Sequence, residues 1–245
     1  MSAAPDDLFA ALFTTWPGAE LHPSNSFVLR RSAGGGNRVR AATWTGKALA
    51  SDAAIAQAAA TMNGWNQPAL FLVQPAQQVL DNRLSALGYT RRDPTILMAG
   101  KVAPLLDIAT PRLSTFEVWP PLAIMDEIWD AGGIGRDRRA IMTRCAAPKT
   151  AIFGREDNRP TATAFAAAMD TTAMVHALEV RPERRRRGVA RRVMARAAQW
   201  AARQGCDAVA VAVTEANAPA IRLYSGLGLR PAAHYHYRCL DGERP

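Results

Sequence analysis

The chain has 245 residues, of which 49% are hydrophobic and 21% charged, a composition that indicates a folded globular protein and excludes general disorder. This length suits two domains of about 120 residues, each able to bury its own core. No apolar run is long enough to span a membrane, and acidic residues stand near the start where a signal peptide carries basic ones, so we expect a cytoplasmic protein without membrane contact. Three widely spaced cysteines indicate neither a disulfide framework nor a metal site.

The first hundred residues predict an alternation of helices and strands. We expect helices at residues 6–15, 51–62 and 77–87, and strands at residues 27–31, 39–44, 69–73 and 95–99. Residues 104–112 are the predicted linker, because Pro104 and Pro111 interrupt regular structure there. The domains are therefore expected at residues 1–103 and 113–245.

The second half repeats this succession loosely. We expect strands at residues 113–119, 150–155, 161–169, 173–180, 208–213 and 234–240, and helices at residues 122–129, 136–145, 189–204 and 217–227. The strands at 150–155 and 161–169 are joined through turn residues, which predicts an antiparallel meander.

The stretch from Val175 to Arg192, VHALEVRPERRRRGVARR, runs from an apolar strand through a basic turn into a helix. The unpaired N–H groups and the dipole at a helix N-terminus attract anions. Gly188 lacks the Cβ that would block a phosphate, and small Ala190 keeps the first helical turn open. We call residues 185–190 the cradle, and we predict that a pyrophosphate binds there.

The cradle spacing Arg-x-x-Gly-x-Ala resembles the acyl-CoA motif of the GNAT superfamily of N-acetyltransferases. The later segment NAPAIRLYSGLGL, which begins at Asn217, resembles the second motif of that superfamily, N-x-x-A-x-x-L-Y followed by a glycine and a strand. The two motifs stand in the expected order, and the resemblance covers about residues 113–240. It implies an α/β acyl-CoA N-acyltransferase fold, a mixed and mostly antiparallel sheet flanked by helices, with two such domains in tandem.

The same resemblance implies acetyl-CoA as cosubstrate. In that superfamily the strand before the cradle splays from its neighbour, and its backbone groups, here the N–H groups of Leu178 and Val180, pair with the pantetheine arm. The implied acetyl-CoA-binding residues are Leu178, Glu179, Val180, Arg185, Arg186, Arg187, Gly188, Val189, Ala190, Arg191 and Asn217. Asn217 is also expected to cap the helix at residues 217–227. Residues 1–103 show no such cradle, so we interpret them as a degenerate acetyltransferase-like domain, with an unrelated α/β domain as the alternative.

Two residues are predicted to be catalytic. Tyr224 matches the tyrosine that, in many members, protonates the departing thiolate. His176, in a segment HALEV that resembles HSLAV of arylalkylamine N-acetyltransferases, is the candidate base, although Met174 replaces their other histidine. Strand alternation predicts His176 on the face of Leu178 and Val180, with Glu179 opposite and ranked lower. A packed tyrosine and a structural core histidine are the alternatives.

The excess positive charge is local in sequence, because nine of the thirty Lys and Arg residues lie within residues 181–203 together with one acid, Glu183. Arginines beside the cradle suit the phosphates of CoA better than a nucleic acid, which is expected to need basic residues spread along a face. We therefore expect no nucleic-acid partner.

The predicted reaction is N-acetylation of a small-molecule or peptide amine, by a monomer or homodimer without a metal. Residues 129–144 and the cleft between the two expected domains are the expected acceptor region, since variable helices and loops build the acceptor pockets in the fold that the resemblance implies. A catalytically silent acyl-CoA-binding or sensor protein is the first alternative, and a nucleic-acid-binding module is the second.

Overall fold

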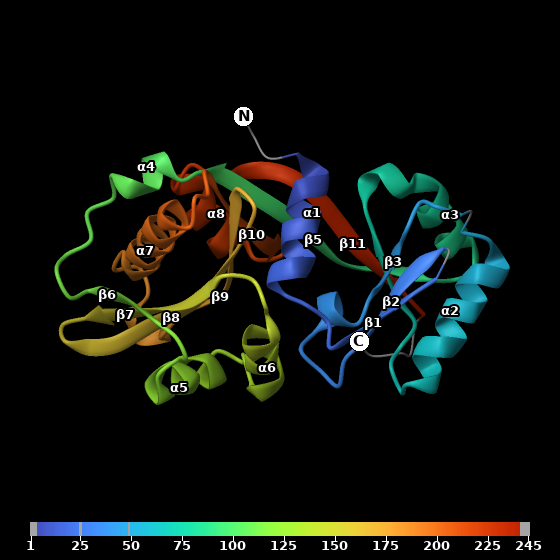
Figure 1. Cartoon of the computed structure of the whole chain (residues 1–245), viewed down its shortest axis with the longest axis horizontal. Helices are drawn as coiled ribbons and strands as arrows, with labels where there is room; N and C mark the ends of the chain where they lie inside the picture. The colour runs from blue at the N-terminus through green and yellow to red at the C-terminus, as the bar shows by residue number, and fades with distance from the viewer. Residues whose placement is uncertain (1–3, 25, 49, 241–245) are drawn as a thin grey trace. The chain divides into compact units, whose positions relative to one another are not determined.

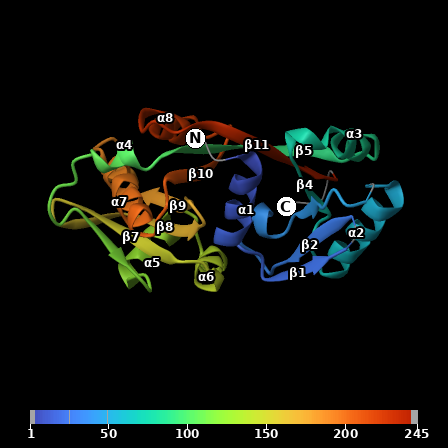
Figure 2. The same cartoon turned by 45° about the horizontal axis from the view of Figure 1, so that its top comes forward.

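The computed structural model describes residues 4–24, 26–48 and 50–240, which form two compact units (Figures 1 and 2). Unit 1 comprises the described residues up to Trp16, Leu97–Val213 and Asn217–Ala233. Unit 2 comprises Pro17–Ile96, Thr214–Ala216 and the described residues from His234 onward. These bounds differ from the consecutive domains expected at residues 1–103 and 113–245, because the first helix belongs to unit 1 and most of the last strand to unit 2.

Unit 1 holds most of the elements. Its helices and strands are α1 (Pro5–Thr15), α4 (Ala103–Leu106), β6 (Thr115–Val118), α5 (Ala123–Ala131), α6 (Arg136–Arg144), β7 (Lys149–Glu156), β8 (Arg159–Met169), β9 (Thr172–Val180), η3 (Pro182–Arg184), α7 (Val189–Arg203), β10 (Ala208–Thr214) and α8 (Ala218–Gly226). Two long strands, β5 (Thr90–Lys101) and β11 (Arg230–Cys239), contribute residues to both units.

The sheet of unit 1 has the strand order β11-β5-β10-β9-β8-β7-β6. Strands β6 to β9 form the predicted antiparallel meander, whereas β9 and β10 pair in parallel. Helix α7 packs on one face, where the side chain of Val193 fills the space left by Gly154. Helix α1 packs against β8 and β9 on the other face, where Trp16 touches Phe165. The predicted mixed sheet with helices on both sides is confirmed.

Unit 2 has the strand order β1-β2-β3-β4-β11. Its remaining elements are β1 (Glu20–Pro23), β2 (Phe27–Arg31), η1 (Asn37–Val39), β3 (Ala42–Trp44), α2 (Asp52–Gly64), β4 (Leu70–Val73), η2 (Pro75–Gln77) and α3 (Gln78–Ala86). Phe27, Phe71 and Tyr89 lie in its buried core together with Ile55 and Leu80 from the two helices. None of the helices in the described part of the chain is long and apolar enough to cross a membrane.

The periodicity of apolar residues predicted α7 to within one residue. Its buried residues follow one helical face, from Val189 through Val193 to Ala201. The chain turns into this helix at Gly188, whose φ of 75° is left-handed and unfavourable for residues with a Cβ. The predicted strand at 39–44 is shorter than expected, since Asn37–Val39 forms a turn of 3-10 helix and β3 begins at Ala42.

Candidate functional site

Strands β9 and β10 stay paired only over their first residues. Their register joins Thr172 to Ala208 and ends where Met174 meets Ala210, although β9 continues to Val180. On its other edge β9 remains paired with β8 up to Val180. The second half of β9 therefore has one edge that does not hydrogen-bond to β10, as the resemblance predicts for the strand that receives the pantetheine arm.

A β-bulge interrupts β9 in the middle of this edge. His176 pairs with Phe165 and Glu179 pairs with Thr163, so two residues of β9, Ala177 and Leu178, stand opposite a single residue of β8. Ala177 has a φ of 51°, and its carbonyl accepts a 2.8 Å hydrogen bond from the indole N–H of Trp129.

This bulge overturns the prediction that His176 and Glu179 lie on opposite faces. Directly paired residues of an antiparallel ladder share a face, and their partners Phe165 and Thr163 are two residues apart on β8. His176 and Glu179 therefore lie on the same face of the sheet, the one that α1 covers. The alternation of side chains along a strand predicted the wrong face because the bulge adds one residue between His176 and Glu179.

The cradle follows β9 as the sequence predicts. Arg186 and Gly188 both have left-handed backbone, with φ values of 65° and 75°. Gly188 is the N-cap of α7 and accepts the helical bond from the N–H of Arg192 at 3.1 Å. The N–H groups of Val189, Ala190 and Arg191 lie in the first helical turn, where no helical carbonyl can accept them. The cradle thus offers backbone donors at the positive end of a helix dipole.

The arginines around the cradle are mostly paired with acids, which corrects the charge estimate made from sequence alone. In the described part of the chain, six of the nine arginines at residues 181–203 form ion pairs with Glu117, Glu156, Asp157 or Glu179. The count along the sequence missed these acids because they come from β6, from β9 and from the end of β7 with the turn that follows it. Arg181, Arg186 and Arg191 form no ion pair among the described residues.

The side chains of Arg185 and Glu179 both hydrogen-bond to the backbone of Val180. The Glu179 carboxylate accepts the Val180 N–H at 3.2 Å and the Arg185 guanidinium at 3.0 Å. Arg185 Nε donates to the Val180 carbonyl at 3.0 Å. Val180 directs these groups away from β8, since the next residue, Arg181, bonds to Thr161 of that strand. Two side chains therefore hydrogen-bond to the backbone groups that are predicted to pair with the pantetheine arm.

Gly132 makes room for Glu179. A Cβ at this position would lie 2.5 Å from Cγ of Glu179 and 2.6 Å from its Oε2, so the Glu179 side chain would have to move. The absence of a Cβ at Gly132 thus leaves space for this carboxylate beside the end of α5.

His176 is buried, with 6% of its surface exposed. Its Nε2 lies 2.8 Å from Oγ1 of Thr15, and its ring lies 4.9 Å from the ring of Trp16. Both partners belong to α1 or its C-cap, about 160 residues away in sequence, and no local pattern pointed to them.

Tyr224 is also buried, at 8% exposure, in the last turns of α8. Burial raises the pKa of its phenol to about 12. No hydrogen bond joins its hydroxyl to the described residues. At neutral pH the hydroxyl is protonated and able to donate to a bound group, which is the state required of a proton donor.

Asn217 caps α8 as predicted, since its side-chain oxygen accepts the N–H of Ala220 at 3.2 Å. The three cysteines are free and buried, and burial raises the thiol pKa of Cys145 and of Cys206. A surface cavity of about 630 Å³ lies elsewhere in unit 1, along the ends of β5 and the start of β10, and none of the predicted site residues lines it.

The fold and the family agree with this geometry. A family model described as Acetyltransferase (GNAT) family matches residues 119–229, from Trp119 to Leu229. This segment belongs to the GNAT family. Comparison with curated proteins gave no match.

Solved structures extend the fold likeness of this GNAT domain to the whole chain. A GCN5-related N-acetyltransferase from Kribbella flavida matches with a TM-score of 0.72 and 19% identity, over 99% of this chain and 97% of its own. A conserved protein of unknown function from Staphylococcus epidermidis matches with a TM-score of 0.64 and 11% identity, over 91% and 94%. A tandem GNAT protein from the clavulanic acid biosynthesis pathway matches with a TM-score of 0.60 and 15% identity, over 97% and 96%. At these identities the likeness shows only that the chain shares its fold with these structures over nearly its whole length.

Proposed function

We propose that this chain is an acetyl-CoA-dependent N-acetyltransferase that acts on a primary amine by direct attack on the thioester. The observation that carries the proposal is the combination, within one GNAT domain, of the open edge of β9 and a cradle with left-handed residues at Arg186 and Gly188. An extended pantetheine arm needs such an edge, and a pyrophosphate needs such donors.

In this proposal the backbone of Leu178 and Val180 receives the pantetheine arm and the thioester carbonyl. The N–H groups of Val189, Ala190 and Arg191 bind the pyrophosphate, with Arg186 and Arg191 adding positive charge that no acid of the described chain neutralises. Before Val180 can pair with a ligand, Arg185 and Glu179 must leave its backbone groups. The attraction of Arg185 to the phosphates would drive that exchange.

The proposed chemistry forms a bond between the amine nitrogen and the acetyl carbon and breaks the bond between that carbon and sulfur. The ammonium loses one proton to a base before it attacks, and the departing thiolate takes a proton from Tyr224. The second proton, which the nitrogen loses once it is acylated, restores the tyrosine. Tyr224 fits the second role because its hydroxyl is protonated at neutral pH and bonds to no described residue.

For the base we propose His176 acting through water, with Glu179 as the alternative on the same face. Thr15 donates its hydroxyl to the Ala11 carbonyl at 2.6 Å, so its oxygen accepts from Nε2–H of the histidine. This bond places the ring proton on Nε2 and so fixes the tautomer of the histidine.

The experiment that tests the function has two readouts. Calorimetry measures acetyl-CoA binding to the full chain, and thiol release is then screened against small amines, amino acids and peptides. We expect binding together with thiol release for at least one amine class. Binding without release for any class would favour a catalytically silent acyl-CoA-binding protein, and absence of binding would refute the proposal.

A further inference from the structure

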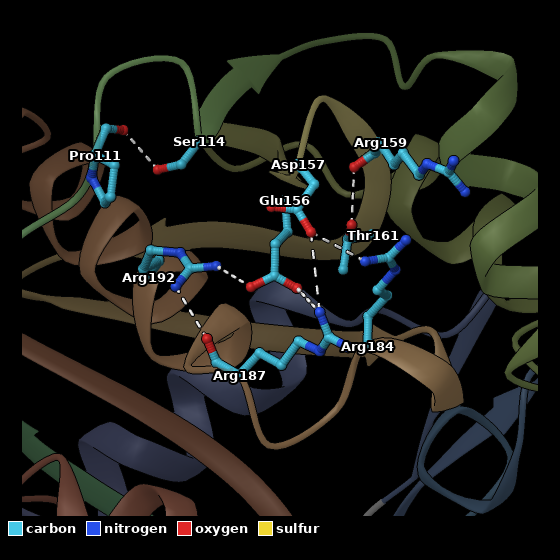
Figure 3. Close-up of polar contacts among 9 residues, drawn as sticks. All are labelled: Pro111, Ser114, Glu156, Asp157, Arg159, Thr161, Arg184, Arg187 and Arg192. Carbon is cyan, nitrogen blue, oxygen red and sulfur yellow. Dashed lines mark hydrogen bonds and ion pairs between the residues drawn. The ribbon is translucent and has the colours of Figure 1, made fainter.

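The end of β7 and the turn after it bring two carboxylates to the side of the cradle (Figure 3). Asp157 Oδ2 lies 3.2 Å from Nη1 of Arg184 and 3.9 Å from Nη1 of Arg187. Glu156 contacts Arg187 at 3.9 Å through Oε2 and Arg192 at 3.3 Å through Oε1. The two acids thus hold three arginines that stand before, within and after the cradle.

A further bond closes this network. Arg192, in the first turns of α7, donates from Nη1 to the backbone carbonyl of Arg187 at 3.1 Å. Glu156 therefore reaches the backbone of the cradle through the guanidinium that it pairs with, as Figure 3 shows. The side chains of Glu156 and Arg192 are only 15% and 18% exposed, so solvent screens this pair less than an ordinary surface pair.

The network encloses a strained residue. Arg186 has a φ of 65°, which costs an ordinary residue free energy because its Cβ approaches the backbone. Its neighbours Arg184 and Arg187 are held by Asp157, whereas Arg186 itself forms no ion pair with the described residues. Anchored neighbours keep a residue in such a conformation when free ones would let it relax.

We propose that Glu156 and Asp157 are positioning residues for acetyl-CoA, which hold the cradle in the conformation whose N–H groups receive the pyrophosphate and do not touch the ligand themselves. This inference rests on the proposed function and adds to it two acids that no motif contains. The three arginines they hold then act as supports of the loop rather than as phosphate ligands.

Two physical effects oppose each other when such a carboxylate is removed. Freed arginines would attract phosphate and strengthen binding, whereas a relaxed loop would misplace the backbone donors and weaken it. We expect the second effect to dominate, because several N–H groups depend on one backbone conformation while a freed arginine is screened by solvent. Weaker CoA binding in the variants therefore indicates that the carboxylates position the loop, whereas tighter binding indicates that they only neutralise the arginines.

The test compares Asp157→Asn and Glu156→Gln in the full chain with Glu117→Gln as the matched control. Glu117 also pairs with two arginines of α7, Arg196 and Arg203, but far along the helix from the cradle. We expect the dissociation constant of CoA and the KM for acetyl-CoA to rise about fivefold in the two cradle-side variants, with kcat at saturation unchanged. Glu117→Gln should change the melting temperature without changing either constant.

A second background separates loop positioning from general destabilisation. Glycine adopts positive φ without strain, so in an Arg186→Gly background the loop depends less on its anchors. Asp157→Asn should then weaken CoA binding by less than about twofold, compared with about fivefold in the natural chain. The same loss in both backgrounds would overturn the proposal.

The remaining outcomes are also decisive. Tighter or unchanged CoA binding in Asp157→Asn and Glu156→Gln, or an equal loss in Glu117→Gln, would overturn the positioning role while leaving the proposed function intact. Absence of CoA binding by the unaltered chain would overturn the proposed function and this inference with it.

Discussion

Thr15 and His176 are 161 residues apart in sequence and are joined by a 2.8 Å hydrogen bond. The threonine ends the first helix, and the histidine lies directly before the bulge of β9. Because the Thr15 hydroxyl donates to Ala11, the ring N–H must donate to the threonine oxygen. One hydrogen bond thus attaches α1 to the strand that carries the proposed base.

The first prediction concerns this bond. Thr15→Val keeps the shape of the side chain and leaves the ring N–H of His176 without its acceptor, so the free energy of unfolding should fall by about 1–3 kcal/mol. Thr14→Val, on the exposed side of the same helix, is the control and should have little effect. Urea unfolding measures both variants.

His176→Ala then separates a catalytic from a purely structural histidine. If His176 accepts the amine proton, this variant should lose the acidic limb of the pH–rate profile, because no group then gates attack by its protonation. An unchanged profile, accompanied only by lower stability, would assign His176 to the core and favour Glu179 as the base.

The second prediction concerns Gly188. Valine at a φ of 75° is strained, so Gly188→Val should displace the first turn of α7 and weaken CoA binding about tenfold or more. Gly205→Val is the control, since Gly205 has a φ of 81° just past the other end of the helix, with open space around it. Both variants should lose stability, and calorimetry should show a loss of CoA affinity in Gly188→Val alone. Equal affinity in the two variants would mean that the cradle does not bind CoA.

The cradle and its helix could be predicted from sequence because their determinants are local: a glycine at positive φ, small residues and a helical apolar stripe. The cap by Asn217 is local too, and the structure confirms it. The bulge at Ala177 could not be predicted, since neither glycine nor another turn-forming residue marks it and a bulge depends on the partner strand. The ion pairs of the arginines could not be predicted for a related reason, because Glu156 and Asp157 lie about thirty residues before the loop that they hold.

The third prediction concerns turnover in Tyr224→Phe. This variant removes one hydroxyl and leaves the ring in place, so kcat should fall about 10²- to 10⁴-fold while acetyl-CoA affinity stays nearly constant. Because the hydroxyl bonds to no described residue, its removal should not lower the melting temperature. Natural turnover in this variant would leave a binding or sensor function as the better interpretation.

The fourth prediction concerns the stability of the folded protein at alkaline pH, which depends on the same residue. Burial raises the pKa of Tyr224 from 10 to about 12, so between these values the unfolded chain loses the phenolic proton while the folded chain keeps it. The folded state then binds more protons, and its stability falls as pH rises. Relative to Tyr224→Phe, the natural chain should lose up to about 3 kcal/mol across this range.

Urea unfolding of both proteins below pH 10 and near pH 12 checks this, because all other titrating groups cancel in the difference. A constant difference between the two proteins would show that the phenol is more accessible to water than its burial indicates. With its pKa raised to about 12, Tyr224 should not produce an alkaline limb in the rate profile of the free enzyme below pH 10.

Helix α1 leaves the ribosome well before the strands that cover its apolar side, because β8 and β9 follow about 150 residues later. Until then Leu8 and Leu12, which are fully buried in the finished protein, belong to a helix that lacks the two strands it packs on. Contacts between segments so far apart in sequence form slowly, and the apolar side of α1 stays exposed until they form. We therefore expect chaperones to bind this helix during synthesis. A nascent chain arrested before residue 172 should therefore be captured by hydrophobic-binding chaperones, and one released after β9 is complete should escape them.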